Sequence, residues 1–150
     1  TIQTTITDGA RDPADSQSRM SQMPAFGTGI LTAEQIGQVA DHVLSLSGKA
    51  RDNVAGAQLF EQNCAVCHGP AGKGNRAVGA PNLSDAIWLY GGTKADVMAQ
   101  VTNPRHGTMP AWGHRLDPVT IKMLTAYVHS LGGGENFVEA APEAQADAQP

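Results

Sequence analysis

The sequence has few cysteines, few aromatic residues and no long apolar run. Its 150 residues include two cysteines, two tryptophans, two tyrosines and three phenylalanines. A single pair of cysteines so close together does not make a disulfide framework. No apolar stretch is long enough to span a bilayer, and no charged and then apolar leader stands at the start. With 17 glycines and so few aromatics, we expect loops that pack around something other than large side chains.

No strong charge of one sign covers the chain. Its formal net charge is −4, and residues 53–137 carry six basic and five acidic residues. No basic patch with interleaved aromatics is present, so nucleic-acid binding has no support. The tail, 136–150, is acidic, and from residue 138 it has almost nothing apolar beyond valine and alanine. Such a segment cannot bury enough surface to offset its ordering entropy, so we expect a disordered tail.

A five-residue pattern occurs twice. Met-Pro-Ala-Phe-Gly at residues 23–27 returns as Met-Pro-Ala-Trp-Gly at residues 109–113. A helix signal follows each copy: Thr32 is placed to form a capping box with Gln35, and Asp117 precedes a proline in the first turn. The two predicted helices share the spacing of their apolar residues, which stand at Ile36, Val39, Val43 and Leu46 and at Ile121, Leu124, Val128 and Leu131. Two unrelated amphipathic helices are the alternative, and they require both matches to be accidental.

The remaining pattern predicts an all-α chain of short helices joined by long loops. Helices are expected over residues 32–47, 53–65, 93–103 and 117–131. The first and last of these stop at glycines, which are common just beyond a helix end. Residues 2–8 weakly echo residues 97–103, so the repeat extends upstream of each methionine.

The motif that indicates chemistry is Cys-Ala-Val-Cys-His at residues 64–68. This is the attachment signature of c-type haem. The thiols of Cys64 and Cys67 can add to the two vinyl groups on one porphyrin edge, and His68 is then held under the iron. A thioredoxin-like dithiol would need a βαβ setting, which is absent. A zinc site would need two more ligands, for which His106 and His114 are candidates, but no second paired spacing exists.

Met109 is the expected sixth ligand of the iron. It follows the motif in a loop, before a proline, whereas a methionine that fills a core usually stands on an apolar helix stripe. A soft thioether suits low-spin iron, and His/Met ligation closes the iron to substrates. His106 and His114 are rival ligands. With both axial positions filled, outer-sphere electron transfer remains, and the chain has no catalytic centre of its own.

Several residues together resemble the class I cytochrome c fold. They are Gly56, Phe60, the motif at 64–68 with Gly69, Pro81-Asn82-Leu83, Met109-Pro110 and Tyr127. The resemblance implies that Gly56 and Phe60 of the first helix pack against Tyr127 of the last. It also implies that the carbonyl of Pro81 orients His68.

A narrower resemblance lies in residues 79–92, with Trp88-Leu89-Tyr90 at their centre. They resemble the second haem domain of the dihaem subunit III of cbb-type cytochrome c oxidase, and residues 19–48 resemble the end of its first haem domain. The implied organisation is a distal half of a first cytochrome c domain at 1–48, a linker at 49–52, a complete domain at 53–135 and the tail at 136–150.

The resemblance implies a redox relay in the bacterial periplasm, at the inner membrane. Such a subunit takes electrons from a soluble or anchored cytochrome c. It passes them towards the catalytic subunits of a haem-copper oxidase, beside a monohaem cytochrome subunit. A freestanding dihaem carrier, or the cytochrome subunit of a periplasmic dehydrogenase, is the alternative. A haem peroxidase or a gas sensor would need an open or labile iron site.

The first repeat has a methionine but no attachment motif. Met23 stands where Met109 stands in the second copy, whereas Met20 lacks the Pro-Ala-aromatic-Gly that follows. We therefore expect Met23 to be the axial ligand of a first haem, and the chain to be an N-terminally truncated fragment. The missing part should hold another Cys-x-x-Cys-His and, before it, a membrane-spanning helix. The alternative is an intact protein in which residues 1–48 serve as a docking arm.

Overall fold

The computed structural model describes residues 2–132 and confirms the all-α class. Within that range the regular elements are helices, and the β-pairing is limited to isolated bridges. The helices in chain order are α1 (Ile2–Asp8), the 3₁₀ turn η1 (Phe26–Thr28), α2 (Ala33–Leu46), α3 (Val54–Asn63), α4 (Ala65–His68), α5 (Lys94–Thr102) and α6 (Pro118–Ser130). The predicted tail at 136–150 lies outside the described residues.

The helices begin where the sequence predicts, because the predicted caps form. The side chain of Thr32 accepts a hydrogen bond from the backbone N–H of Gln35, and the side chain of Gln35 accepts one in return, which completes the capping box of α2. Asp117 accepts from the first backbone N–H groups of α6. These bonds satisfy N–H groups that a helix start otherwise leaves without partners.

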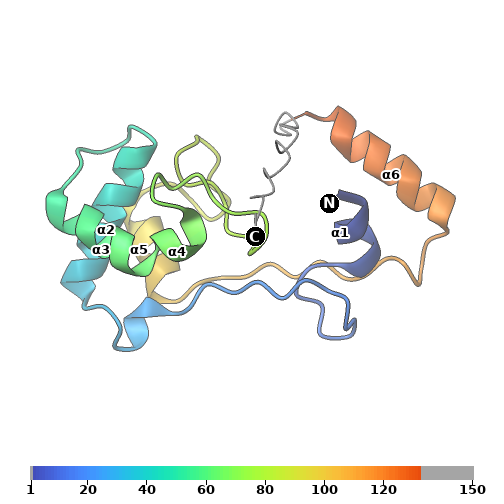
Figure 1. Cartoon of the computed structure of the whole chain (residues 1–150), viewed down its shortest axis with the longest axis horizontal. Coiled ribbons are helices and arrows are strands. Elements are labelled where there is room, and N and C mark those ends of the chain that lie inside the picture. The colour runs from blue at the N-terminus through green and yellow to red at the C-terminus, as the bar shows by residue number, and fades with distance from the viewer. Residues whose placement is uncertain (1, 133–150) are drawn as a thin grey trace, which may run out of the picture.

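Figure 1 shows two lobes joined by two extended segments. One lobe contains α2, α3, α4 and α5, and the other contains α1 and α6. The two segments lie within residues 9–25 and 103–117, and their extended parts run side by side between the lobes, whereas residues 13–17 and 113–115 form turns. They are joined where Ala10 and Met109 exchange two backbone hydrogen bonds of 2.9 Å each.

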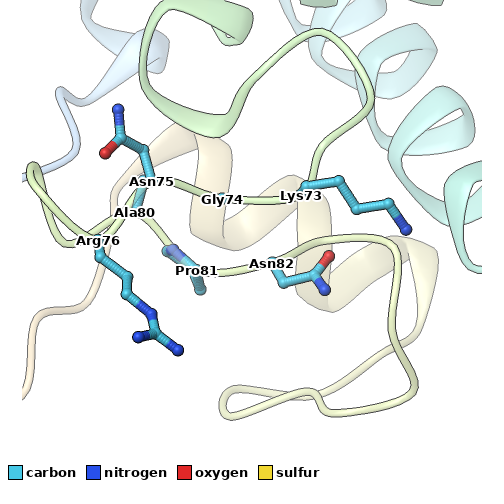
Figure 2. A pocket seen from close by; sticks show the side chains of 7 residues that line it. All are labelled: Lys73, Gly74, Asn75, Arg76, Ala80, Pro81 and Asn82. Carbon is cyan, nitrogen blue, oxygen red and sulfur yellow. The ribbon is translucent and has the colours of Figure 1, made fainter. Parts of the chain in front are cut away.

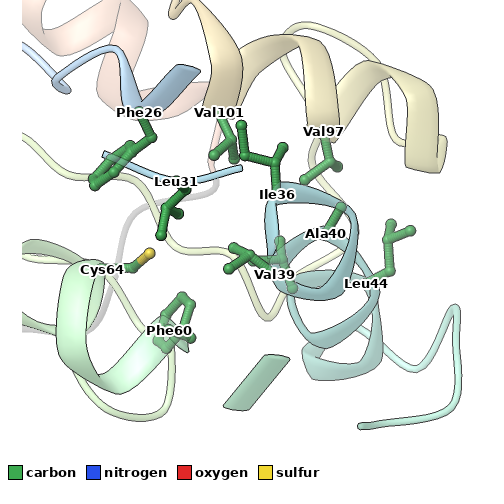
Figure 3. Close-up of a cluster of buried hydrophobic side chains, with 11 residues drawn as sticks. Phe26, Leu31, Ile36, Val39, Ala40, Leu44, Phe60, Cys64, Val97 and Val101 are labelled. Atoms are coloured by element: carbon green, nitrogen blue, oxygen red, sulfur yellow. The ribbon is translucent and has the colours of Figure 1, made fainter. Parts of the chain in front are cut away.

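The apolar core lies in the α2–α5 lobe, and α2 is its centre (Figure 3). Val39 of α2 and Phe60 of α3 are fully buried, and Val97 and Val101 of α5 close the other side. Phe26, the first residue of η1, packs into the same cluster. The core therefore draws on both copies of the repeat.

The last helix does not take the place that the cytochrome resemblance implies. Helix α6 packs on α1, and Tyr127 is 62% exposed. The α3 residue Gly56 instead faces α2, so closely that an added Cβ would clash with the carbonyl oxygen of Gln38. The implied packing of Gly56 and Phe60 against Tyr127 is therefore wrong for this structure. Helix α2 can replace α6 because the two helices carry the same apolar stripe.

The two Met-Pro-Ala-aromatic-Gly loops show the same exchange. A Cβ added to Gly27 would lie 2.9 Å from the carbonyl oxygen of Thr102, in α5. A Cβ added to Gly113 would lie 3.0 Å from the carbonyl oxygen of Thr7, in α1. Each loop thus packs on the helix that precedes the other copy. The domain bounds at 48 and 53 stay a prediction.

Candidate haem-attachment site

The attachment motif lies at a break between two helices. The backbone N–H of Cys64 donates to the carbonyl of Phe60 over 2.8 Å, and this bond closes α3. The chain then turns, with φ −115° at Cys64, and the N–H of His68 donates to the Cys64 carbonyl over 2.9 Å. The short helix α4 therefore presents Cys67 and His68 within one turn of Cys64. The sequence predicts one continuous helix to residue 65. The structure differs, because α3 ends at Asn63 and α4 begins at Ala65.

Both cysteines are free thiols, but their surroundings differ. Cys64 is buried in the apolar cluster, beside Phe60 and Leu31 (Figure 3), whereas Cys67 is partly exposed. Burial, with a smaller contribution from Cys67, raises the pKa of Cys64 to about 11. The Cys64 sulfur thus lies against an apolar surface, whereas the Cys67 sulfur is closer to solvent.

The imidazole of His68 is oriented by the carbonyl of Pro81. His68 is buried, and its Nδ1 lies 3.0 Å from the Pro81 oxygen. A carbonyl oxygen can only accept, so Nδ1 carries the proton and donates. The neutral ring then keeps a lone pair on Nε2, the atom that can bind iron. Burial lowers the pKa of His68, and the bond to Pro81 opposes that effect.

The loop after the motif is a tight fold that ends at Pro81. The N–H of Gly74 donates to the His68 carbonyl over 2.8 Å, and the N–H of Leu83 donates to the Gly72 carbonyl over 2.7 Å. Gly74 has φ +82°, and a Cβ there would lie 2.7 Å from the Ala80 oxygen. Figure 2 shows the polar hollow formed by this loop, lined by Lys73, Gly74, Asn75, Arg76, Ala80, Pro81 and Asn82. These bonds fix the Pro81 carbonyl under the imidazole.

Trp88 is a residue whose role the sequence did not reveal. Its ring packs against the apolar cluster, and Lys49 Nζ lies 5.0 Å from the ring centre. Its indole Nε1 is buried and has no hydrogen-bond partner among residues 2–132. A buried donor without an acceptor costs free energy. The feature of the sequence that could have indicated a role for this residue is a tryptophan in a loop.

The predicted axial methionines lie in different surroundings. Met23 packs against the cluster that contains Cys64. Nearby, the Ser21 hydroxyl donates to the Val78 carbonyl over 2.6 Å, which joins this segment to the loop after the motif. Met109 is instead half-buried in the bridge with Ala10, on the segment that leads to the other lobe. The structure thus brings Met23, and not Met109, to the core that holds the attachment motif.

The rival ligands are not brought to the cysteines. His106 is exposed, and the side chain of His114 is 84% exposed, with Nε2 3.3 Å from the Asp15 carboxylate. Met20 is 63% exposed. Within residues 2–132, no group of three or more His, Cys, Asp or Glu side chains is arranged to hold a metal ion. The zinc alternative therefore finds no support there.

The helical fold and the Cys-x-x-Cys-His site define a c-type cytochrome. A sequence profile described as cytochrome c oxidase, cbb3-type, subunit III, matches residues 51–128. The chain belongs to this family, which confirms the resemblance found in the sequence. Membership of a cytochrome c family implies that the chain binds haem c.

The relatives extend the match to most of the chain. The cbb3-type cytochrome c oxidase subunit CcoP of Cereibacter sphaeroides is 51% identical over 138 residues, which cover 89% of this chain and 48% of the relative. The subunit FixP of Azorhizobium caulinodans is 53% identical over 138 residues, which cover 89% and 46%. The chain thus spans about half the length of the curated relatives it matches. Among residues 2–132, no helix combines the length and apolarity that crossing a membrane requires.

Proposed function

We propose that this chain is an electron-transfer part of a cbb3-type oxidase subunit and carries one covalent haem c. The observation that carries the proposal is the oriented imidazole of His68, whose Nε2 is left for iron by the bond from Nδ1 to Pro81. The family match gives this site its chemical meaning. When bound, the haem supplies a centre that gains and loses single electrons.

Each residue of the site has a defined task in this proposal. The thiols of Cys64 and Cys67 form the covalent bonds, and His68 is the proximal ligand. The carbonyl of Pro81 holds the imidazole in one orientation, and burial favours its neutral form. By chain order the sixth ligand is Met109, from the methionine loop of the second repeat.

The electrons come from a periplasmic cytochrome c and pass to the catalytic subunits of the haem-copper oxidase, beside a monohaem cytochrome subunit. The names of the relatives as oxidase subunits support this direction. In the full subunit, Met23 serves a second haem whose attachment motif precedes it. The chain acts on the periplasmic side of the inner membrane.

An intact mass with a haem stain tests the attachment. The chain, matured with haem, should gain the mass of one haem and keep it after denaturation. Cys64→Ala and Cys67→Ala should weaken or abolish that retention, and His68→Ala should remove the low-spin spectrum. His106→Ala is the matched control, because His106 is an exposed histidine outside the site. A chain that gains no covalent haem contradicts the proposal.

A further inference from the structure

The carbonyl that orients His68 belongs to a residue that cannot anchor it. The Nδ1 of His68 lies 3.0 Å from the carbonyl oxygen of Pro81. Proline has no backbone N–H, so it cannot donate a hydrogen bond that would hold its own position. The Pro81 carbonyl lies in the planar peptide group that ends with the N–H of Asn82. The direction of this carbonyl therefore depends on the residues before and after Pro81.

Before Pro81 the chain is held by backbone contacts. The N–H of Asn75 donates to the Ala80 carbonyl over 2.9 Å, and the N–H of Ala80 donates to the Asn75 carbonyl over 3.0 Å. Gly74 lies close to the next peptide group, because a Cβ added there would be 2.8 Å from the nitrogen of Asn82 and 2.8 Å from the carbonyl carbon of Pro81. These contacts fix the chain up to the carbonyl and cover one side of its peptide group.

After Pro81 the side chain of Asn82 closes a small turn. Its Oδ1 accepts hydrogen bonds from the backbone N–H of Ser84 over 2.9 Å and from the Ser84 hydroxyl over 2.8 Å. An asparagine side chain that bonds the backbone two residues ahead forms an Asx turn, and the hydroxyl adds a second donor to the same oxygen. Between the two residues, the N–H of Leu83 donates to the Gly72 carbonyl over 2.7 Å. Figure 2 shows Asn82 directly after Pro81 in the loop.

We propose that Asn82 and Ser84 are positioning residues that hold the Pro81 carbonyl on His68 and thereby lower the reduction potential of the haem. A hydrogen bond donated by Nδ1 makes Nε2 a more basic ligand. A more basic ligand favours the oxidised iron, and hydrogen bonds of this kind are one way in which a protein sets a haem potential. The inference rests on the proposed haem, and it goes beyond it by assigning the residues that set the strength of the proximal ligand.

A second asparagine in the same loop provides a matched control. The Oδ1 of Asn75 accepts a hydrogen bond from the backbone N–H of Ala77 over 2.9 Å, so it closes a turn of the same kind. Asn75 also lines the same hollow as Asn82 (Figure 2). Its turn does not include the peptide group of Pro81. Removing the Asn75 side chain should therefore loosen the loop to a similar extent, while its backbone bonds to Ala80 remain.

Redox titration of the haem-loaded chain tests the proposal. We expect Asn82→Ala to raise the midpoint potential, because the carbonyl is no longer held on His68. Ser84→Ala should raise it by less, because the Ser84 N–H still donates to Asn82, and Ser84→Thr should keep the wild-type value because it keeps the hydroxyl. Asn75→Ala should leave the potential unchanged. A wild-type potential in Asn82→Ala, or an equal rise in Asn75→Ala, overturns the positioning role.

The Nδ1 proton of His68 gives a second readout that a purely structural role would not move. In the NMR spectrum of the reduced chain, this proton should exchange with solvent faster in Asn82→Ala than in the wild type or in Asn75→Ala. Equal exchange in all three chains overturns the proposal. If Asn82→Ala does not fold, the two Ser84 variants decide, and equal potentials in Ser84→Ala and Ser84→Thr overturn it.

The covalent haem, counted by mass in every variant, separates this proposal from the proposed function. A wild-type chain without covalent haem contradicts the proposed function, and with it the positioning role. Wild-type and Asn82→Ala chains that both carry covalent haem and a low-spin spectrum, but have the same potential, contradict only the positioning role.

Discussion

The helices α2 and α6 carry one apolar pattern in two environments. Val39 of α2 is fully buried between α3 and α5. Its counterpart Leu124 in α6 is 37% exposed, and among the described helices α6 contacts α1 alone. The stripes have the same spacing, so the difference comes from the neighbours and not from the helices. The apolar stripe of a helix predicts how much surface the helix can bury, but it does not predict which of two equivalent partners the helix packs on.

The largest contrast between the lobes is expected when one aromatic ring is removed from α3 and, separately, one from α6. Phe60→Ala should destabilise the chain by about 3–5 kcal/mol, because Phe60 is 1% exposed and the ring leaves a cavity. Tyr127→Ala should cost less than about 1 kcal/mol, because Tyr127 is mostly exposed. Denaturant unfolding of the two variants measures both values. Equal losses would indicate that Tyr127 covers Phe60 in solution, as the cytochrome resemblance implies.

The sequence predicts local structure well because local structure depends on neighbours in the chain. Thr32, Thr93 and Asp117 each begin a helix by bonds to residues two or three positions ahead, and all three form. The motif at 64–68 is local too, and its histidine is oriented by Pro81 as the resemblance implies.

Two features could not be predicted in this way: which helix packs on α3, and the buried Nε1 of Trp88 that has no hydrogen-bond partner among residues 2–132. Two copies of one stripe make α2 and α6 equal candidates for α3, and no residue pattern within either helix decides between them. The unpartnered Nε1 of Trp88 depends on what packs around the indole, which is a property of the folded chain.

Alanine at the two loop glycines sharpens the comparison at equivalent points. Gly27→Ala and Gly113→Ala should each cost about 1–3 kcal/mol, because the new Cβ would press on the backbone of Thr102 or Thr7. Similar losses at both sites would show that the two contacts are equivalent. Gly37→Ala in α2 is the control, since its Cβ would meet only Met98 Cε at 3.8 Å. That variant should be neutral or more stable by up to about 1 kcal/mol. A neutral Gly113→Ala would contradict the packing of residues 109–113 on α1.

Removing the N-cap of each stripe helix has a smaller and more even effect. Thr32→Ala and Asp117→Ala should each destabilise by about 1 kcal/mol, because each leaves backbone N–H groups of a first turn without an acceptor. The comparison lies in what else is lost: uncapping α2 loosens the core of the larger lobe, whereas uncapping α6 loosens the smaller lobe. Hydrogen exchange should therefore rise in α3 and α5 for Thr32→Ala, but only in α1 and α6 for Asp117→Ala. Exchange that rises throughout the chain in both variants would show that the lobes unfold together.

The smallest effect is expected from the exposed carboxylate of Asp52, which forms a hydrogen bond with a buried histidine of α2. Asp52 Oδ1 lies 2.7 Å from Nδ1 of His42, a buried histidine of α2 whose ring is 5.1 Å from that of Phe60. The hydrogen bond from His42 is the main cause that lowers the pKa of Asp52 below 3.8, and burial opposes it. Because the folded-state pKa lies below the unfolded-state value, the carboxylate stabilises the fold above about pH 3.8 and loses this effect as the pH falls through its folded-state pKa. Asp52→Asn should therefore be slightly less stable than the wild type near neutral pH, and the difference should vanish in acid. Denaturant midpoints of the two chains, followed from neutral to acidic pH, measure this convergence. A gap between the midpoints that stays constant or widens in acid would show that the Asp52 carboxylate does not act on the fold through its charge.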